Sequence, residues 1–189
     1  KKPDVSFVGF CPKFSGRALL SFSPKSFFYP IKSSVYFNRN LGIERLKNFS
    51  EKVQVKLLLN NNYAAFSGNS EAELQIKNYN QSLTMTDYVF CPRGFGNGSM
   101  RFYEVLSAGR IPIIPETNSG FPLTYVDPFF TNSALIVKYF SNWENIILSH
   151  WETLEHNYLN LQIDNYRFYN DYLDIEKYLG KLFSPYLSN

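Results

Sequence analysis

Short apolar runs bounded by turn-forming residues alternate along this chain with stretches of helical periodicity. Near-continuous apolar runs are typical of buried parallel strands, and they cover residues 5–10, 53–59, 88–90, 111–114 and 134–137. The intervening helix candidates are residues 41–49, 70–79 and 99–108. This order predicts an α/β fold, a Rossmann-like parallel sheet with helices on both faces.

Two further helices are predicted in the last third of the chain. Ser141 and Glu144 have the spacing of a capping box, which would open a helix with Trp143, Ile147 and Trp151 on its buried face. Another helix is expected from about residue 164 to residue 182. Because no repeat or linker interrupts the pattern, we expect residues 1–189 to form a single domain.

Composition narrows the class of protein. A chain of 189 residues with 18% aromatic and 19% charged residues is typical of a globular domain. The net charge of +3 suits a few phosphates in a pocket and not a nucleic-acid surface, which needs many clustered cations. Cys11 and Cys91 are expected to be free thiols, and His150 and His156 to be packing or surface residues, with no metal-binding spacing around them.

The compartment is weakly constrained. No run of about 18 apolar residues occurs, so the piece is expected to be soluble as it stands. An abrupt start suggests a fragment of a longer protein, and a membrane anchor upstream would place it in the Golgi lumen. A glycan at the sequon Asn97-Gly98-Ser99 would block the loop described next, which slightly favours the cytoplasm.

The stretch from Asp87 to Gly109 reads as a strand, a glycine-rich loop and a helix. Glycines let the backbone approach a ligand, and the free N–H groups of a helix start favour an anion, so the loop predicts a phosphate site. Ser99 is the expected N-cap residue of the helix and Gly109 its C′ residue. The helix is expected to pack on the sheet through an apolar face formed by Phe102, Val105 and Leu106. The loop glycines are Gly94, Gly96 and Gly98.

Three charged residues accompany this loop. Arg93 precedes the glycines, and Arg101 and Glu104 lie three positions apart on the helix. A guanidinium group suits a pyrophosphate, and a carboxylate can accept hydrogen bonds from two ribose hydroxyls. The alternatives are a solvated surface pair of Arg101 with Glu104 and glycines that only make a tight turn.

A sequence echo extends the hypothesis. Phe10-Cys11-Pro12-Lys13 and Phe90-Cys91-Pro92-Arg93 both follow predicted strands. If these strands are parallel in one sheet, both loops leave its carboxyl edge, where ligands of open α/β sheets bind. Lys13 and Arg17 would then clamp a diphosphate from the side opposite Arg93.

Four ordered motifs resemble the exostosin-type glycosyltransferase signature. They are Tyr79-Asn80-Gln81-Ser82-Leu83, Phe90-Cys91-Pro92-Arg93-Gly94, Ser99-Met100-Arg101-Phe102-Tyr103-Glu104-Val105-Leu106 and Ala108-Gly109-Arg110-Ile111-Pro112-Ile113-Ile114. The resemblance implies the carboxyl-terminal, donor-binding half of a two-domain GT-B enzyme, with Glu104 holding the ribose. Arg110 stands where the pattern usually has a cysteine, and Pro115-Glu116-Thr117-Asn118 replaces an acidic stretch.

By that resemblance the reaction is inverting transfer of a sugar from a nucleotide, a UDP-sugar rather than a GDP-sugar, to a glycan acceptor in polysaccharide biosynthesis. The chain has no Asp-x-Asp element, so no metal and no other cofactor is expected. No residue is identified as the catalytic base, which an amino-terminal domain or partner chain would supply. The rival functions are a non-catalytic sugar-nucleotide or glycan-binding module and a fucosyltransferase-like enzyme using a guanine nucleotide.

Overall fold

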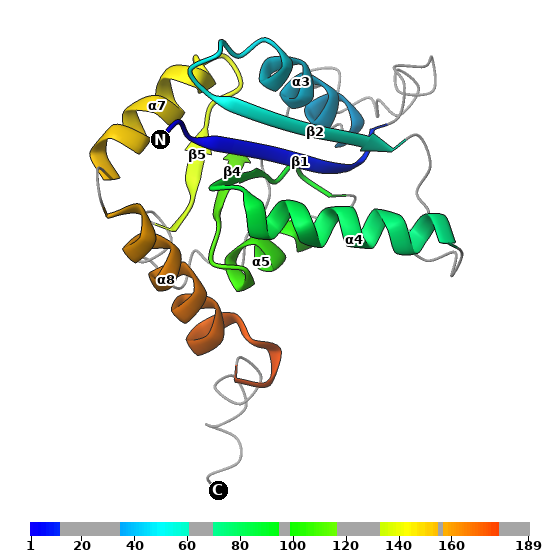
Figure 1. Cartoon of the computed structure of the whole chain (residues 1–189), viewed down its shortest axis with the longest axis vertical. Coiled ribbons are helices and arrows are strands. Elements are labelled where there is room, and N and C mark those ends of the chain that lie inside the picture. Colours follow the sequence, from blue (N-terminus) through cyan, green and yellow to red (C-terminus); the bar gives the residue numbers. More distant parts are fainter. Residues whose placement is uncertain (12–34, 61–69, 95–98, 117–132, 155–156, 178–189) are drawn as a thin grey trace, which may run out of the picture.

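The computed structural model describes residues 1–11, 35–60, 70–94, 99–116, 133–154 and 157–177. Its centre is one five-stranded parallel sheet with the order β2-β1-β3-β4-β5 (Figure 1). The strands are β1 (Asp4–Phe10), β2 (Gln54–Asn60), β3 (Tyr88–Phe90), β4 (Ile111–Pro115) and β5 (Leu135–Val137). The predicted α/β fold with a Rossmann-like parallel sheet is confirmed, and all five predicted strands are present.

Helices lie between these strands and follow the last of them. They are α3 (Val35–Lys47), α4 (Ser70–Met85), α5 (Met100–Ser107), α7 (Trp143–Leu154) and α8 (Tyr158–Phe168), the last followed by the π-helical turn η3 (Tyr169–Leu173). Helix α3 begins at Val35, six residues before the predicted start, and Asn38 in this added part is fully buried. The last helix begins at Tyr158 and not near residue 164.

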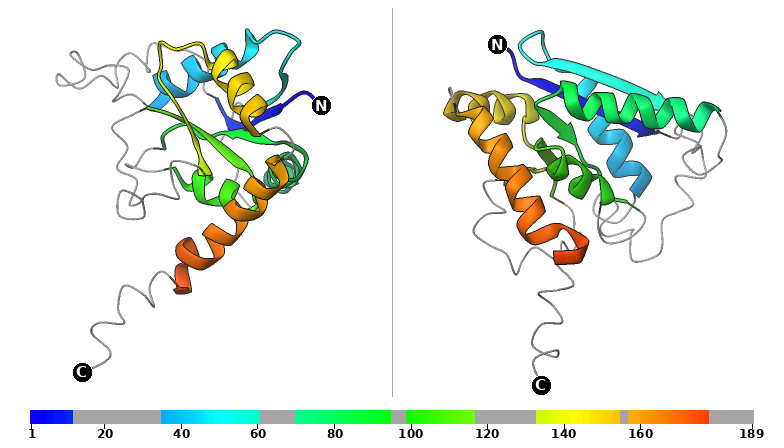
Figure 2. Two further views of the ribbon diagram at one scale, coloured as in Figure 1. Left: turned by 90° about the vertical axis from the view of Figure 1, so that its left-hand side faces the viewer. Right: turned by 60° about the horizontal axis from the view of Figure 1, so that its bottom comes forward.

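Each face of the sheet has its own apolar core. On one face, α3 and α7 cover β1, β3 and β4 with a cluster that includes Ile43, Phe90 and Trp143. On the other face, α4, α5 and α8 pack against the sheet through a cluster that includes Leu83, Phe102 and Phe168 (Figure 2). The predicted apolar face of α5 is confirmed, since Phe102, Val105 and Leu106 are fully buried.

Helix ends agree only in part with the sequence. Gly109 is the C′ residue of α5, as predicted: it has φ +67°, its N–H donates to Leu106 O, and the next N–H donates to Val105 O. The predicted capping box of α7 is wrong, because Asn142 Oδ1 accepts from Asn145 N at 3.0 Å. Glu144 instead accepts hydrogen bonds from Ser50 on a neighbouring turn.

Arg110, the residue that departs from the exostosin pattern, joins two helices at the amino-terminal edge of the sheet. Its guanidinium group donates to Leu83 O at 2.7 Å and Thr84 O at 2.8 Å in the last turn of α4. A third bond, of 3.1 Å, reaches Gln162 Oε1 on α8. Because α4 ends at Met85, Arg110 satisfies carbonyls that have no partner within that helix.

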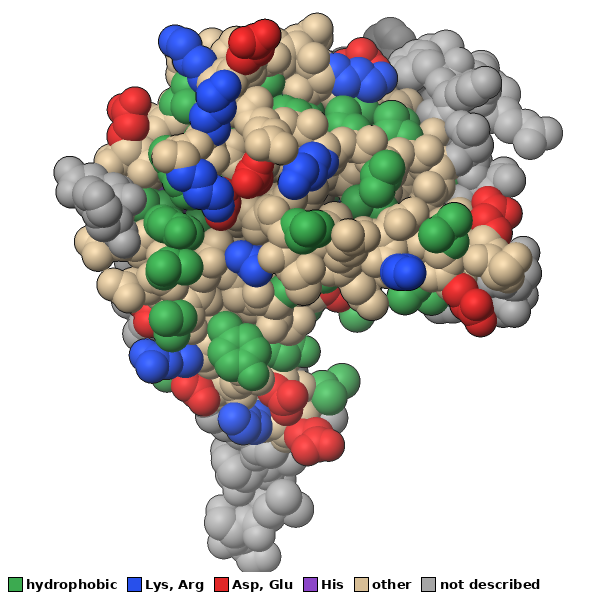
Figure 3. All heavy atoms as spheres, viewed as in Figure 1, with side chains coloured by type: hydrophobic (Ala, Val, Ile, Leu, Met, Phe, Trp, Pro, Cys, Tyr) green, Lys and Arg blue, Asp and Glu red, His purple; other side chains and the backbone are tan. Residues whose placement is uncertain are grey.

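The surface carries charges of both signs. On the face seen in Figure 3, Lys and Arg side chains are interspersed with Asp and Glu side chains, with apolar groups between them. Within the described ranges, no helix combines the length and apolar composition that crossing a membrane requires.

Candidate functional site

The carboxyl ends of β1 and β3 diverge where the strand order reverses. Register pairs Val5 with Tyr88 and Ser6 with Val89, whereas β1 continues to Phe10 beside β2. In open α/β sheets ligands bind at such a switch point. The loops of the Phe-Cys-Pro echo therefore do leave adjacent parallel strands at one edge. Lys13, Arg17, Gly96, Gly98, Thr117 and Asn118 lie outside the described residues.

Arg101 enters the split between β1 and β3. Its Nη2 donates to Val8 O at 2.7 Å, and its guanidinium carbon lies 4.5 Å from the centre of the Phe7 ring and 5.3 Å from that of Tyr79. Gly9 makes room for it, since a Cβ at that position would lie 2.7 Å from Nη2. Among the described residues Arg101 forms no ion pair with Glu104, so the alternative of a solvated surface pair is wrong.

Arg39, on α3, reaches the same strand from the opposite face of the sheet. Its Nη1 donates to Phe10 O at 2.9 Å. Carbonyls alternate along a strand, so those of Val8 and Phe10 point toward β3, as that of Asp4 does when it accepts from Asp87 N. Two guanidinium groups thus bind carbonyls roughly 7 Å apart along β1. Sequence reasoning missed Arg39 because it placed the start of α3 after this residue.

The described part of the glycine-rich loop lies at the carboxyl end of β3, beside the split between β1 and β3. Arg93 and Gly94 are half-buried after β3, and Ser99 is buried ahead of α5. Ser99 is the N-cap residue of α5, as predicted, and has the extended backbone of that position, although its side chain makes no capping hydrogen bond. Burial raises the pKa of the Tyr139 hydroxyl, and the positive charges of Arg45 and Arg93 act against that rise.

Glu104 lies on the exposed side of α5 and has a partner on α4. The Tyr79 hydroxyl donates to Glu104 Oε2 at 2.6 Å. Burial raises the pKa of Tyr79 well above its usual value, so its hydroxyl stays protonated and remains a donor. The structure therefore brings Arg101, Glu104 and Tyr79 together, and Tyr79 had been noted only as part of the exostosin-type motif.

His150 is a packing residue, as predicted. Its Nδ1 lies 2.8 Å from the hydroxyl of Tyr88, the first residue of β3, at the edge opposite the switch point. Burial raises the pKa of Tyr88, which keeps the hydroxyl a donor, and lowers the pKa of His150, which keeps the imidazole neutral. His150 is thus engaged away from the candidate site, and His156 lies outside the described residues.

This contact predicts a pH dependence of stability. The ordinary pKa of histidine is about 6.5, and below that pH the unfolded chain takes up a proton that folded His150 resists. The free energy of unfolding therefore decreases as the pH is lowered. His150→Gln should flatten this dependence, because its amide oxygen can accept the Tyr88 bond without titrating. Urea unfolding of both proteins between about pH 7.5 and 5.5 is the measurement. Parallel curves would contradict a buried neutral imidazole.

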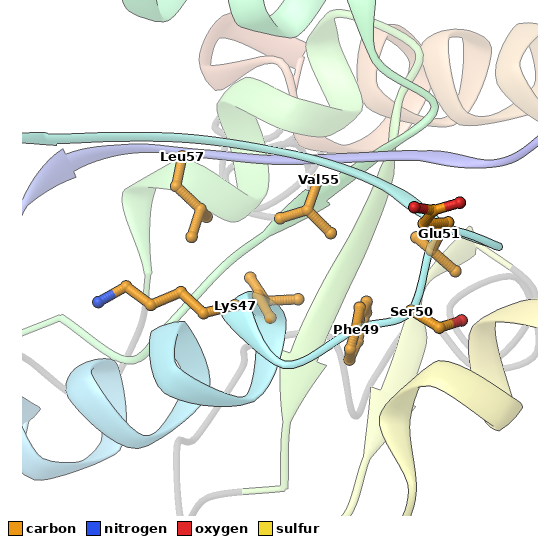
Figure 4. Close-up of a pocket in the computed structure, with 8 residues that line it drawn as sticks. Lys47, Phe49, Ser50, Glu51, Val55 and Leu57 are labelled. Carbon is orange, nitrogen blue, oxygen red and sulfur yellow. The ribbon is translucent and has the colours of Figure 1, made fainter.

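One surface hollow of about 390 Å³ lies away from the switch point, at the end of α3 (Figure 4). Val55 and Leu57 of β2 line it together with Lys47 and Phe49. Val55 lies near the amino end of β2 and Leu57 at its middle. Ligands of open sheets bind beyond the carboxyl ends of the strands, so the hollow is not assigned to the donor. Across the described part of the chain, no three His, Cys, Asp or Glu side chains gather to hold a metal ion.

A family model, the RXYLT1 C-terminal domain, matches residues 13–157, which is most of the chain. The chain belongs to this family. A comparison of the chain with curated proteins found no match. The RXYLT1 C-terminal domain family is related to xylosyltransferases, so the chain is a glycosyltransferase-type domain, consistent with the carboxyl-terminal half of such an enzyme. The match includes all nine predicted site residues, from Lys13 to Glu104.

Proposed function

We propose that this glycosyltransferase-type domain is the donor-binding half of an exostosin-like GT-B enzyme. It binds a nucleotide sugar at the split between β1 and β3 and transfers the sugar to a hydroxyl of a glycan acceptor. The supporting observation is the pair of arginines, Arg39 and Arg101, that enter this split from opposite faces of the sheet. Two positive charges at a switch point suit the diphosphate of such a donor.

The diphosphate would lie between these guanidinium groups and the glycine-rich loop. Arg93 adds a third positive charge, and the first N–H groups of α5 add partial ones. Fixed donors of this kind stabilise a leaving diphosphate as its charge develops, which makes the transfer independent of a metal. Lys13 and Arg17 complete the proposed clamp.

Glu104 would accept hydrogen bonds from the two ribose hydroxyls, and the exostosin resemblance favours uridine over guanine nucleotides. The transfer proceeds with inversion through an oxocarbenium-like state, and a base must remove the acceptor proton. His150 does not suit this task, because it is bonded to Tyr88 at the opposite edge of the sheet. We assign the base to an amino-terminal domain or partner chain.

Calorimetry with a nucleotide panel tests the proposal. UDP should bind at least tenfold more tightly than uridine, because the loop and the arginines address phosphate. Equal affinities for UDP and uridine would contradict the donor site. Tighter binding of GDP than of UDP would favour the fucosyltransferase-like alternative.

A further inference from the structure

Tyr79, on α4, contacts both Arg101 and Glu104. Its hydroxyl donates to Glu104 Oε2 at 2.6 Å, and its ring centre lies 5.3 Å from the Arg101 guanidinium carbon. Arg101 is itself fixed to Val8 O of β1. A continuous set of contacts therefore runs from β1 through Arg101 and Tyr79 to Glu104.

The hydroxyl of Tyr79 restricts the conformation of the Glu104 side chain, which is otherwise exposed to solvent. A glutamate on the surface of a helix samples several rotamers, and ordering it on binding a ligand costs free energy. The bond from Tyr79 holds one carboxylate oxygen in place before any ligand arrives, and Oε1 stays available to accept further bonds. Recognition of two neighbouring hydroxyls depends on such a fixed carboxylate.

We propose that Tyr79 is a positioning residue that sets the ribose specificity of the donor site by orienting Glu104. The inference rests on the proposed function. It separates two features of one side chain: the hydroxyl serves ribose recognition, and the ring packs against Arg101.

Tyr79→Phe tests this division, because it removes the hydroxyl and keeps the ring. The readout is the ratio of the affinities for UDP and 2′-deoxy-UDP, measured by calorimetry on the whole chain. We expect the ratio to fall roughly threefold to tenfold, the range of one hydrogen bond, with the affinity for 2′-deoxy-UDP unchanged within about twofold. Retained binding of 2′-deoxy-UDP also shows that the variant is folded.

Two comparison variants sharpen the result. Glu104→Gln should lower the same ratio, and adding Tyr79→Phe to it should cause little further loss, because both changes disturb one interaction. Tyr166→Phe is the matched control, since Tyr166 lies half-exposed on α8. It should leave the ratio unchanged.

The outcomes distinguish this inference from the proposed function. If Glu104→Gln lowers the ratio and Tyr79→Phe does not, the role of Tyr79 is overturned and the donor site stands. If Tyr79→Phe weakens both nucleotides equally or does not fold, the hydroxyl supports the structure alone, and the inference is again overturned. If the unaltered chain binds neither nucleotide, the proposed function fails and the inference fails with it.

Discussion

Arg101→Ala should weaken UDP binding by about 1.5–3 kcal/mol and also lower the free energy of unfolding. The first effect follows from the loss of a charged contact to the diphosphate. The second follows because Val8 O, which β3 does not pair, loses the 2.7 Å bond from Nη2. A part-buried carbonyl without a partner costs about 1–3 kcal/mol. Calorimetry with UDP and urea unfolding measure the two effects separately.

Arg167→Ala is the matched control for this experiment. Arg167 is also an arginine on a helix, but its side chain is 71% exposed. Its ion pair, from Nη1 to Asp164 Oδ1 at 3.9 Å, is a weak surface contact. Arg167→Ala should change neither the free energy of UDP binding nor the free energy of unfolding by more than about 0.5 kcal/mol. A loss of stability in Arg101→Ala with unchanged UDP affinity would reduce Arg101 to a structural residue.

Gly9→Ala should lower the free energy of unfolding by about 2–3 kcal/mol and weaken UDP binding as well. Gly9 has φ +155°, a conformation that residues with a side chain rarely adopt. The added Cβ would also lie 2.7 Å from Arg101 Nη2, so the guanidinium group must leave Val8 O. Urea unfolding of the variant measures its free energy of unfolding, and calorimetry measures its affinity for UDP.

The double variant Gly9→Ala/Arg101→Ala separates the two causes. Removing Arg101 relieves the clash and leaves the backbone strain, so the two stability losses should sum to more than the loss in the double variant. Strictly additive losses would show that Gly9 and Arg101 do not interact.

The order of strands and helices could be predicted because local signals determine it. Near-continuous apolar runs predicted every described strand, and the spacing of Phe102, Val105 and Leu106 predicted the buried face of α5. The C′ position of Gly109 was likewise readable, since a left-handed residue after a helix is most often glycine. Periodicity and turn chemistry act over a few residues, which is the range that a sequence pattern reports.

Contacts between distant elements could not be predicted in the same way. Arg39 and Arg101 are 62 positions apart, and only the divergence of β1 from β3 shows why both bind carbonyls of one strand. The cap of α7 is Asn142 and not the predicted Ser141. Glu144 accepts a hydrogen bond from Ser50, which is 94 positions away in the sequence. The bond from Tyr79 to Glu104 depends on how α4 lies beside α5.

The location of bound UDP tests the central claim most directly. Backbone amide chemical shifts, followed by NMR during a titration with UDP, report which residues sense the ligand. We predict the largest changes at Phe10, at Gly94 and in the first turn of α5 around Arg101, the residues that border the split between β1 and β3. The largest changes at the hollow beside Phe49 and Val55, with the split unaffected, would contradict the proposed donor site.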